Sequence, residues 1–251
     1  MPDDENRSKM VAGEGVDELR LAGLKIIQAD AGYRFSLDPV LLCAFARIPR
    51  GARVVDLGTG SGVIPLLLAR QGVAATLLGI EIQQELAERA ERNVLLNDLQ
   101  EQVTILRGDL RQPQPQLPPQ AFDVVLANPP YRQPGTGRVA PAAERAAARH
   151  ELAGGLDDFL AAAGRLLRDG GRVYLVFLAE RLAELLEAMR QRQLEPKRLR
   201  CVHSRSGDPA RMVLVEGRKR GGCGLLIDPP LYIYEGEQYS PEVQALYAVE
   251  S

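Results

Sequence analysis

The sequence has few of the residues on which metal and redox chemistry depend. Its 251 residues include two histidines, His150 and His203, and three cysteines, Cys43, Cys201 and Cys223. The cysteines lie far apart, so none belongs to the close pairs that zinc sites and redox motifs use, and we interpret them as free thiols. We therefore expect a chemistry that needs no metal ion.

Long apolar runs are missing as well. No run reaches the roughly 18 apolar residues that a membrane-spanning helix needs, and the acidic start of the chain lacks the apolar segment of a signal peptide. We expect a cytoplasmic protein with no membrane partner. The net charge of −2 gives the molecule as a whole no general attraction for polyanions.

What the sequence does contain is typical of an α/β domain. Hydrophobic residues make up 45% and charged residues 25% of the chain, which is enough apolar material for a full core. Apolar runs alternate with segments of helical periodicity, as in a parallel sheet with crossover helices. The expected strands cover residues 53–57, 75–80, 103–107, 122–127, 172–178, 196–203 and 211–215. The expected helices cover residues 64–70, 83–96, 156–167 and 180–193, with Asn97 and Gly170 as terminators.

The domain organisation is expected to be simple. Residues 1–16 are polar and without periodicity, so we predict a disordered segment there and one domain over residues 17–251. Within it, residues 17–50 are expected to form an N-terminal lid or helical segment, and residues 221–251 a C-terminal extension. The connection over residues 132–153 is unusually long, and such loops are more often functional than accidental.

A glycine-rich turn, Asp56-Leu-Gly58-Thr59-Gly60-Ser-Gly62, follows the first of these strands. Glycines permit a tight turn and let the backbone approach a ligand closely. We therefore take Asp56, Gly58, Thr59, Gly60 and Gly62 as candidate cofactor-binding residues. The glycine spacing favours S-adenosylmethionine over a dinucleotide, and a purely structural turn is the alternative.

Two carboxylates end the next two strands. Glu81, followed by Ile82, is placed to accept hydrogen bonds from ribose hydroxyls. Asp109, followed by Leu110, is placed to hold an adenine amino group. We predict that all four residues border the cofactor. A solvated helix cap for Glu81 and an ordinary turn for Asp109 are the alternatives.

The strongest signal is the tetrapeptide Asn128-Pro129-Pro130-Tyr131, which closes the fourth strand. The exocyclic amino nitrogen of adenine is a poor nucleophile because its lone pair is delocalised into the ring. The Asn128 side-chain oxygen and the Pro129 carbonyl can accept both amino hydrogens, and proline holds that carbonyl in place. Tyr131 offers a ring face to a base extruded from its stack. We predict that these four residues are catalytic and that Asn128 also borders the cofactor.

These motifs resemble those of the Rossmann-like S-adenosylmethionine-dependent methyltransferases. Over residues 25–217 the chain resembles the bacterial tRNA adenine-N6 methyltransferases that modify the adenosine beside the anticodon of a valine tRNA, with residues 33–42, 149–151 and 229–235 in support. The resemblance implies a doubly wound seven-stranded sheet, mostly parallel with the last strand antiparallel, and helices on both faces. It also implies S-adenosylmethionine as cofactor, tRNA as partner, and a role for Asp38 in closing the cofactor pocket.

Other functions remain open at this point. Related enzymes with the same tetrapeptide methylate a glutamine of peptide release factors, but they carry a helical domain before the glycine turn. Others methylate adenine in ribosomal RNA or DNA, and DNA enzymes normally need an additional recognition domain. A binding module without activity, such as a scaffold or RNA chaperone, is disfavoured because both the cofactor and the substrate motifs are intact.

Basic residues gather toward the carboxyl end of the chain. Between Glu187 and Arg220 ten basic residues outnumber four acidic ones, a local net charge of +6. This excess favours a tRNA contact that includes Arg218, Lys219 and Arg220, whereas a solvated charged face is the alternative. The ten are Arg190, Arg192, Lys197, Arg198, Arg200, Arg205, Arg211, Arg218, Lys219 and Arg220.

Overall fold

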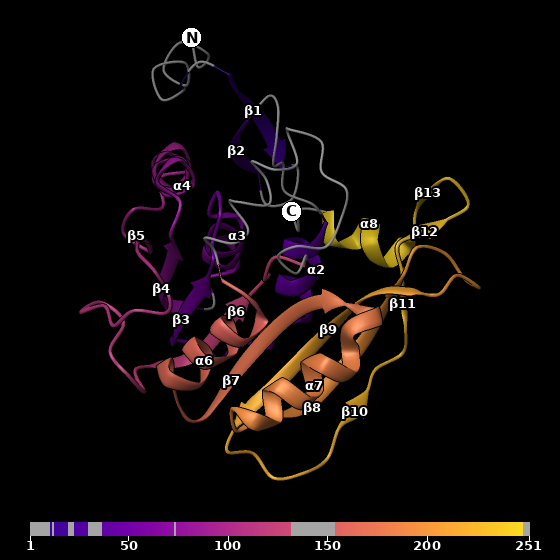
Figure 1. Ribbon diagram of the computed structural model, residues 1–251. Coiled ribbons are helices and arrows are strands. Elements are labelled where there is room, and N and C mark those ends of the chain that lie inside the picture. Colours follow the sequence, from indigo (N-terminus) through magenta and orange to yellow (C-terminus); the bar gives the residue numbers. More distant parts are fainter. Residues whose placement is uncertain are drawn as a thin grey trace, which may run out of the picture.

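The computed structural model describes residues 11, 13–19, 23–29, 37–72, 74–131 and 154–247. Its central sheet contains β3 (Ala52–Leu57), β4 (Ala74–Glu81), β5 (Val103–Arg107), β6 (Phe122–Ala127), β7 (Leu167–Leu178), β8 (Leu194–His203), β9 (Ala210–Lys219), β10 (Leu226–Ile227) and β11 (Leu231–Tyr232). The spatial order is β10-β8-β9-β7-β6-β3-β4-β5, with β11 also beside β8 (Figure 1).

The strand directions confirm the expected fold class. Strands β3 to β7 run parallel to one another, whereas β9 runs antiparallel to both of its neighbours, β7 and β8. The expected number of seven strands was wrong, because β10 and β11 pair with β8 and extend the sheet to nine strands. Each of these two strands has only two residues, too few to produce an apolar pattern in the sequence.

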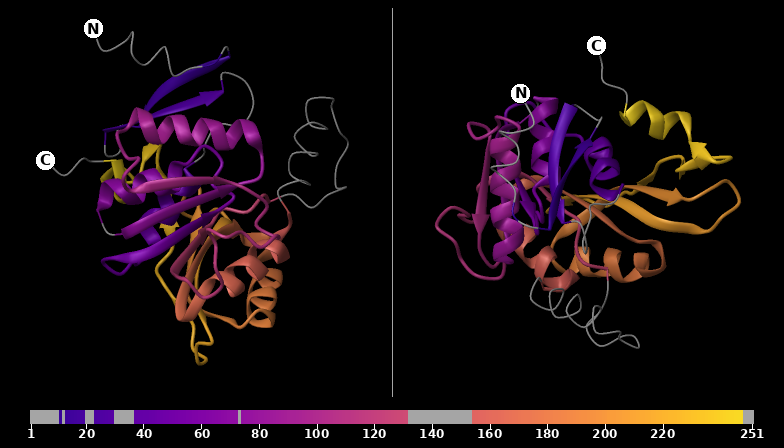
Figure 2. Two further views of the ribbon diagram at one scale, coloured as in Figure 1. Left: turned by 90° about the vertical axis from the view of Figure 1, so that its left-hand side faces the viewer. Right: turned by 90° about the horizontal axis from the view of Figure 1, so that it is seen from above.

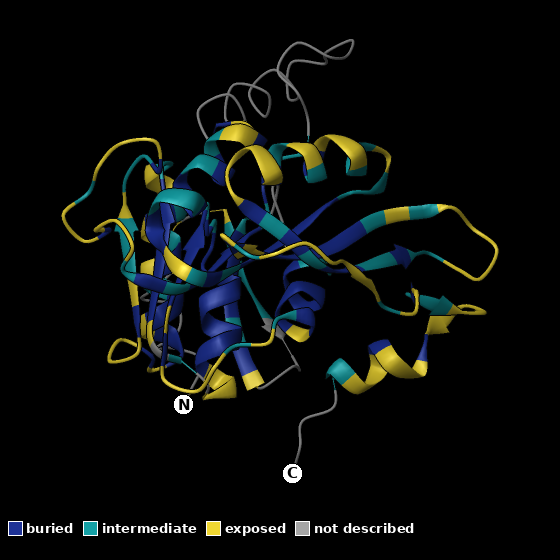
Figure 3. Cartoon of the chain, turned by 90° about the horizontal axis from the view of Figure 1, so that it is seen from below, coloured by how far each residue is buried: buried dark blue, intermediate teal, exposed yellow. Residues whose placement is uncertain are grey.

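Helices cover both faces of the sheet (Figure 1). On one face lie α2 (Asp38–Phe45), α3 (Val63–Gln71) and α4 (Gln84–Leu96), and on the other lie α6 (Leu156–Leu166) and α7 (Leu182–Gln191). The central strands are apolar at successive positions because both of their faces are covered: Val54 packs into one core and Val55 into the other. Figure 3 shows these strands buried between the helices. No helix in the described residues is long and apolar enough to cross a membrane.

The N-terminal region differs from the expectation. Strands β1 (Glu14–Leu19) and β2 (Leu24–Ala29) form an antiparallel hairpin that lies along α4 (Figure 2). The hairpin begins at Glu14, inside the segment 1–16 that we expected to be disordered, and it is not helical. The alternation of buried and partly buried side chains in β2 is short, and side chains of the distant helix α4 hold its backbone. Neither feature stands out in the sequence.

Of the two predicted helix terminators, the structure confirms one. Asn97 directly follows α4, as predicted. Gly170 does not terminate a helix, because α6 already ends at Leu166 and Gly170 lies inside β7 with φ of +77°. After β11 the chain forms β12 (Tyr234–Glu235) and β13 (Gln238–Tyr239), which pair with each other, and then α8 (Pro241–Tyr247).

Candidate functional site

The fold brings four of the predicted polar residues to one edge of the sheet. Asp56 lies near the carboxyl end of β3, Glu81 ends β4, Asp109 follows β5, and Asn128 directly follows β6. These strands are parallel neighbours in the order β6-β3-β4-β5. From β3 the chain continues to β4 and β5 on one side of β3 and then returns to its other side with β6. Ligands of open α/β sheets bind in the crevice that such a reversal of strand order creates.

The glycine turn between β3 and α3 requires its glycines. Gly58, Gly60 and Gly62 all have positive φ, between +57° and +82°, a backbone conformation that residues with a β-carbon rarely adopt. A β-carbon on Gly58 would also lie 3.0 Å from the ring of Phe159. The Gly58 amide donates to the Ile80 carbonyl at 2.9 Å, which ties the turn to the end of β4.

Asp56 is a buried carboxyl group with an unfilled hydrogen-bonding capacity. Its side chain is 2% exposed, and neither its oxygens nor Thr59 Oγ1 has a hydrogen-bond partner among the described residues. Burial raises the pKa of Asp56 to about 8; the Thr59 hydroxyl acts against this rise, and the nearby charge of Glu81 contributes to it. Leaving a polar group buried and unpaired costs free energy. A ligand that carries a cationic donor, such as an ammonium group, would remove this cost.

Glu81 is buried but bonded to the backbone. Its Oε2 accepts from the Gly60 amide and its Oε1 from the Gln83 amide, both at 2.9 Å. Burial raises the pKa of Glu81, although these amide donors act against the shift. A carboxylate oxygen can accept more than one hydrogen bond, so both oxygens retain capacity for ligand hydroxyl groups.

Asp109 has a partner that the sequence analysis missed. The guanidinium of Arg111 binds both of its carboxylate oxygens, at 2.8 Å to Oδ1 and 2.8 Å to Oδ2, and this pairing holds the pKa of Asp109 below its usual value. A group that binds Asp109 must therefore share the carboxylate with Arg111. Two residues downstream of Asp109, Arg111 gave no motif signal. Ile82, Asp109 and Leu110 line one small cavity together with Gly58 and Glu81.

The tetrapeptide after β6 is held by its own hydrogen bonds. The Tyr131 hydroxyl lies 2.7 Å from Asn128 Oδ1 and 2.8 Å from Asp38 Oδ2, at the start of α2. The Tyr131 carbonyl accepts from Arg181 Nη1 at 2.9 Å, and the Tyr131 ring packs edge-on against Phe177. Asp38, which we expected at the cofactor pocket, thus contacts the tetrapeptide. Arg181 and Phe177 belong to no recognised motif and were not predicted.

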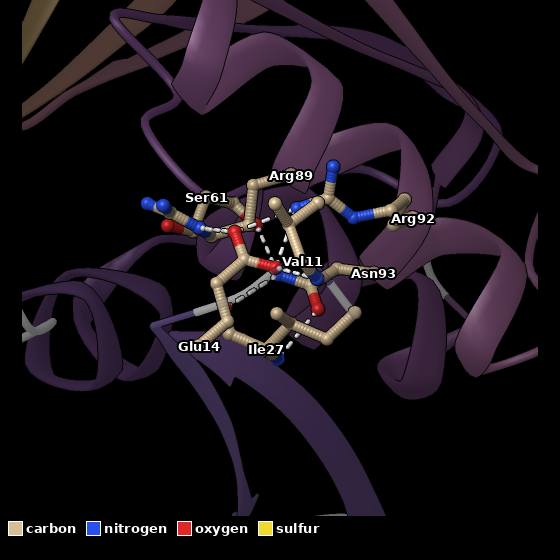
Figure 4. Close-up of polar contacts among 7 residues, drawn as sticks. All are labelled: Val11, Glu14, Ile27, Ser61, Arg89, Arg92 and Asn93. Atoms are coloured by element: carbon tan, nitrogen blue, oxygen red, sulfur yellow. Dashed lines mark hydrogen bonds and ion pairs between the residues drawn. The ribbon is translucent and has the colours of Figure 1, made fainter. Parts of the chain in front are cut away.

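A buried asparagine of α4 joins the N-terminal hairpin to the glycine turn (Figure 4). Asn93 Oδ1 accepts from the Ile27 amide at 2.6 Å, and its Nδ2 donates to the Ser61 carbonyl at 2.9 Å. Asn97, one helical turn later, binds the backbone amide and carbonyl of Lys25. Asn93 was not predicted, and Asn97 was predicted only as a helix terminator; the one sequence signal for Asn93 is a polar side chain on the buried face of an amphipathic helix.

The start of the hairpin is fixed to the same helix. Glu14 accepts from Arg89 Nε at 2.8 Å and from Arg92 Nη2 at 2.6 Å, and it is almost buried (Figure 4). These donors and charges lower the pKa of Glu14 despite the opposing effect of burial. The hairpin, α4 and the glycine turn are therefore one connected polar and packed unit.

The structure does not bring the predicted basic cluster to this edge. Arg218, Lys219 and Arg220 lie at the carboxyl end of β9, which is antiparallel to β7, so they lie at the opposite edge of the sheet. Lys219 is buried and donates to the Leu167 carbonyl at 2.6 Å, and Arg220 pairs with Asp169 at 2.8 Å. Both cations already have partners within the protein.

Several predicted residues give no further information. His150, with residues 149–151, the rest of the connection 132–153 and residues 33–36, lies outside the described residues. His203 ends β8 opposite Ala210 at the amino end of β9; its Nδ1 lies 2.7 Å from the Asp208 carbonyl oxygen, and its ring packs against Tyr232. Within the described part of the chain, no group of three or more His, Cys, Asp or Glu side chains is arranged to hold a metal ion.

Comparison with known proteins gives consistent matches. The methyltransferase small domain family matches residues 38–192. The chain is 34% identical over 190 residues to the tRNA1(Val) (adenine(37)-N6)-methyltransferase of Aeromonas hydrophila, which covers 74% of this chain and 77% of the relative. The enzyme of the same name from Porphyromonas gingivalis is 31% identical, covering 77% of each chain.

Solved structures agree on the fold. A predicted O-methyltransferase from Agrobacterium tumefaciens superposes with a TM-score of 0.67 at 25% identity, covering 84% of this chain and 95% of that one. Its match extends beyond the residues 38–192 that the family covers, so most of the strands and helices described above share the arrangement of that structure.

Proposed function

This chain belongs to the methyltransferase small domain family and to the bacterial tRNA1(Val) (adenine(37)-N6)-methyltransferases, and from this we propose that it methylates tRNA. The proposed reaction moves a methyl group from S-adenosylmethionine to the exocyclic amino nitrogen of the adenosine beside the anticodon of a valine tRNA. The observation that carries the proposal is the position of Asn128-Pro129-Pro130-Tyr131, at the edge of the sheet that also holds the buried carboxyl groups of Asp56 and Glu81.

The residues along β3, β4 and β5 fit the cofactor. The unpaired oxygens of Asp56 and Thr59 Oγ1 suit its amino acid part, which carries a cationic ammonium group. Glu81 suits the ribose hydroxyls, and Asp109 with Leu110 suits the adenine. When bound, S-adenosylmethionine supplies a methyl group on a positively charged sulfur. Because the methyl group is already activated, the protein needs to align, desolvate and polarise rather than to provide a strong base.

The tetrapeptide supplies the polarisation of the target amine. Asn128 and the Pro129 carbonyl each accept one amino hydrogen, which concentrates the nitrogen lone pair toward the incoming methyl group. The nitrogen becomes acidic as its new bond to carbon forms, and one proton then leaves to solvent. Pro130 stiffens the turn, and the ring of Tyr131 supports the extruded base.

Mass spectrometry of nucleosides tests the proposal directly. The protein is incubated with S-adenosylmethionine and an unmodified valine tRNA transcript, and with a transcript in which guanosine replaces the adenosine beside the anticodon. We expect N6-methyladenosine in the first transcript and none in the second. Methylation of a release-factor glutamine with no methylation of tRNA would instead assign the chain to protein substrates.

A further inference from the structure

The hydrogen bonds around Tyr131 impose a condition on the catalytic asparagine. The Tyr131 hydroxyl has one proton and lies within 2.8 Å of two groups, Asp38 Oδ2 and the Asn128 side-chain amide. The carboxylate of Asp38 can only accept a hydrogen bond. The hydroxyl proton therefore goes to Asp38, and the hydroxyl oxygen is left to accept from Asn128.

The condition is that Asn128 donates a hydrogen bond to the Tyr131 hydroxyl oxygen. An asparagine amide does so in only one of its two orientations, the one in which Nδ2 faces the hydroxyl. Oxygen and nitrogen of the amide are nearly equal in size, so which of them faces a neighbour is decided by the hydrogen-bond network. An Oδ1 that faces the hydroxyl oxygen would compete with Asp38 for a single proton. We propose that Asn128 turns its Nδ2 toward Tyr131, and that Asp38 is the positioning residue that enforces this orientation through the Tyr131 hydroxyl.

This orientation matters for the reaction proposed above, on which the inference rests. The substrate amine carries two hydrogens and needs an acceptor, which only Oδ1 of the amide provides. With Nδ2 bonded to Tyr131, Oδ1 is the end of the planar group that remains for the substrate. With the amide reversed, donor would face donor and the amine would not be polarised. Asp38 therefore affects the rate of methyl transfer rather than the affinity for the cofactor.

Asp38→Ala and Tyr131→Phe test the chain of hydrogen bonds. Each should lower the single-turnover rate at saturating tRNA by about tenfold or more, since each releases the amide from its orientation. The double variant should be no slower than Tyr131→Phe alone, because both changes break the same chain. Binding of S-adenosylhomocysteine, measured by calorimetry, should stay within about twofold of wild type.

Two further variants separate positioning from folding. Asp38→Asn retains a side-chain oxygen that accepts the hydroxyl proton, so it should recover the rate to within about threefold of wild type. Tyr174→Phe removes a different tyrosine hydroxyl, which donates to the Arg47 carbonyl at 2.9 Å, and should leave the rate unchanged.

The outcomes distinguish this inference from the proposed function. A wild-type protein that methylates no tRNA overturns both. An active wild type with an unchanged rate in Asp38→Ala overturns the inference alone. Weakened S-adenosylhomocysteine binding in Asp38→Ala, with rate losses that multiply in the double variant, would instead make Asp38 a cofactor contact.

Discussion

The two halves of the site differ in how their polar groups are bonded. In the glycine-turn half, Asp56 and Thr59 are buried, and among the described residues their side-chain oxygens have no partner. In the tetrapeptide half, the side chains of Asn128, Tyr131 and Asp38 bond to one another. The first half holds hydrogen-bonding capacity that no described residue fills and that a ligand can fill, whereas the second is assembled from its own residues.

This difference separates two tasks. Unpaired buried groups gain the most free energy from hydrogen bonds to a complementary ligand, so the glycine-turn half should govern the affinity for the cofactor. Groups fixed in advance stabilise a transition state at no cost of reorganisation, so the tetrapeptide half should govern the rate. Substitutions in the two halves should therefore change different measured quantities.

The largest effect is expected in the tetrapeptide half. Asn128→Ala removes one of two acceptors of the target amine, an interaction that strengthens in the transition state, so turnover should fall by about two orders of magnitude or more. S-adenosylhomocysteine binding, measured by calorimetry, should change little. A wild-type rate of tRNA methylation in Asn128→Ala would defeat the mechanism.

In the glycine-turn half, Asp56→Asn should weaken cofactor binding but stabilise the ligand-free protein. The lost charge-assisted contact amounts to about 1.5–3 kcal/mol. The folded-state pKa of Asp56 is raised from 3.8 to about 8, so the folded state binds more protons than the unfolded state between these values. Stability contributed by this group is therefore lost progressively as pH rises from 3.8 toward about 8.

Thermal unfolding without ligand between pH 5 and pH 9 measures this slope. The midpoint of wild type should fall with rising pH more steeply than that of Asp56→Asn, because the asparagine does not titrate. Parallel pH profiles for the two proteins would contradict the raised pKa of Asp56, and equal affinities for S-adenosylhomocysteine would show that its unfilled capacity does not serve the cofactor.

Within the cofactor half, Glu81 and Asp109 should not contribute equally. Glu81 is 4% exposed and bonded only to backbone amides in the hydrogen bonds described above, whereas Asp109 is partly exposed and shares its carboxylate with Arg111. Glu81→Ala should reduce the binding free energy of the cofactor by about 3 kcal/mol and Asp109→Ala by about 1.5 kcal/mol. Calorimetry of both variants decides the order, and a larger loss in Asp109→Ala would reverse it.

Whether the sequence predicts a contact of this site depends on how far apart its two residues lie in the sequence. Asp56, Glu81 and Asn128 lie at or directly after the carboxyl ends of strands, and the convergence of parallel strand ends brings them together without further information. Asp38 lies far from Tyr131 in the chain, and the hydrogen bond between them depends on how α2 packs against the sheet. No local pattern contains that geometry.

The elements of the fold show the same dependence on separation along the chain. The long central strands and their helices have strong periodicity, and their predicted positions agree closely with the structure. The hairpin β1–β2 is held by α4 through Glu14 and Asn93, contacts that span more than 60 residues. Strands β10 and β11 depend on the edge of β8. Four of the strands that were missed, β1, β2, β10 and β11, thus depend on partners that lie far away in the sequence.

A matched pair of asparagines tests whether the hairpin serves the cofactor half. Asn93 and Asn97 both bind the β2 backbone, but only Asn93 also binds Ser61 of the glycine turn. Both alanine variants should lower the unfolding midpoint, since each leaves buried backbone groups unpaired. Only Asn93→Ala should also weaken S-adenosylhomocysteine binding, by roughly threefold to tenfold. Equal affinities in the two variants would separate the hairpin from cofactor binding.

The smallest effects concern tRNA, and the two ends of β9 provide the comparison. Arg211 is exposed near the amino end of β9, on the edge of the sheet that carries Asn128, whereas Arg220 follows its carboxyl end on the opposite edge and pairs with Asp169. A tRNA whose anticodon loop reaches Asn128 lies along the first edge.

Arg211→Gln should raise the KM for tRNA a few-fold. In a plot of log KM against log salt concentration, its slope should be smaller by about one than that of wild type, as expected for one lost phosphate contact. Arg220→Gln should leave both unchanged, because its charge is remote from the bound RNA and already neutralised. If Arg220→Gln raises KM and Arg211→Gln does not, the tRNA must extend around to the amino ends of the parallel strands, and the basic cluster predicted from composition would regain its role.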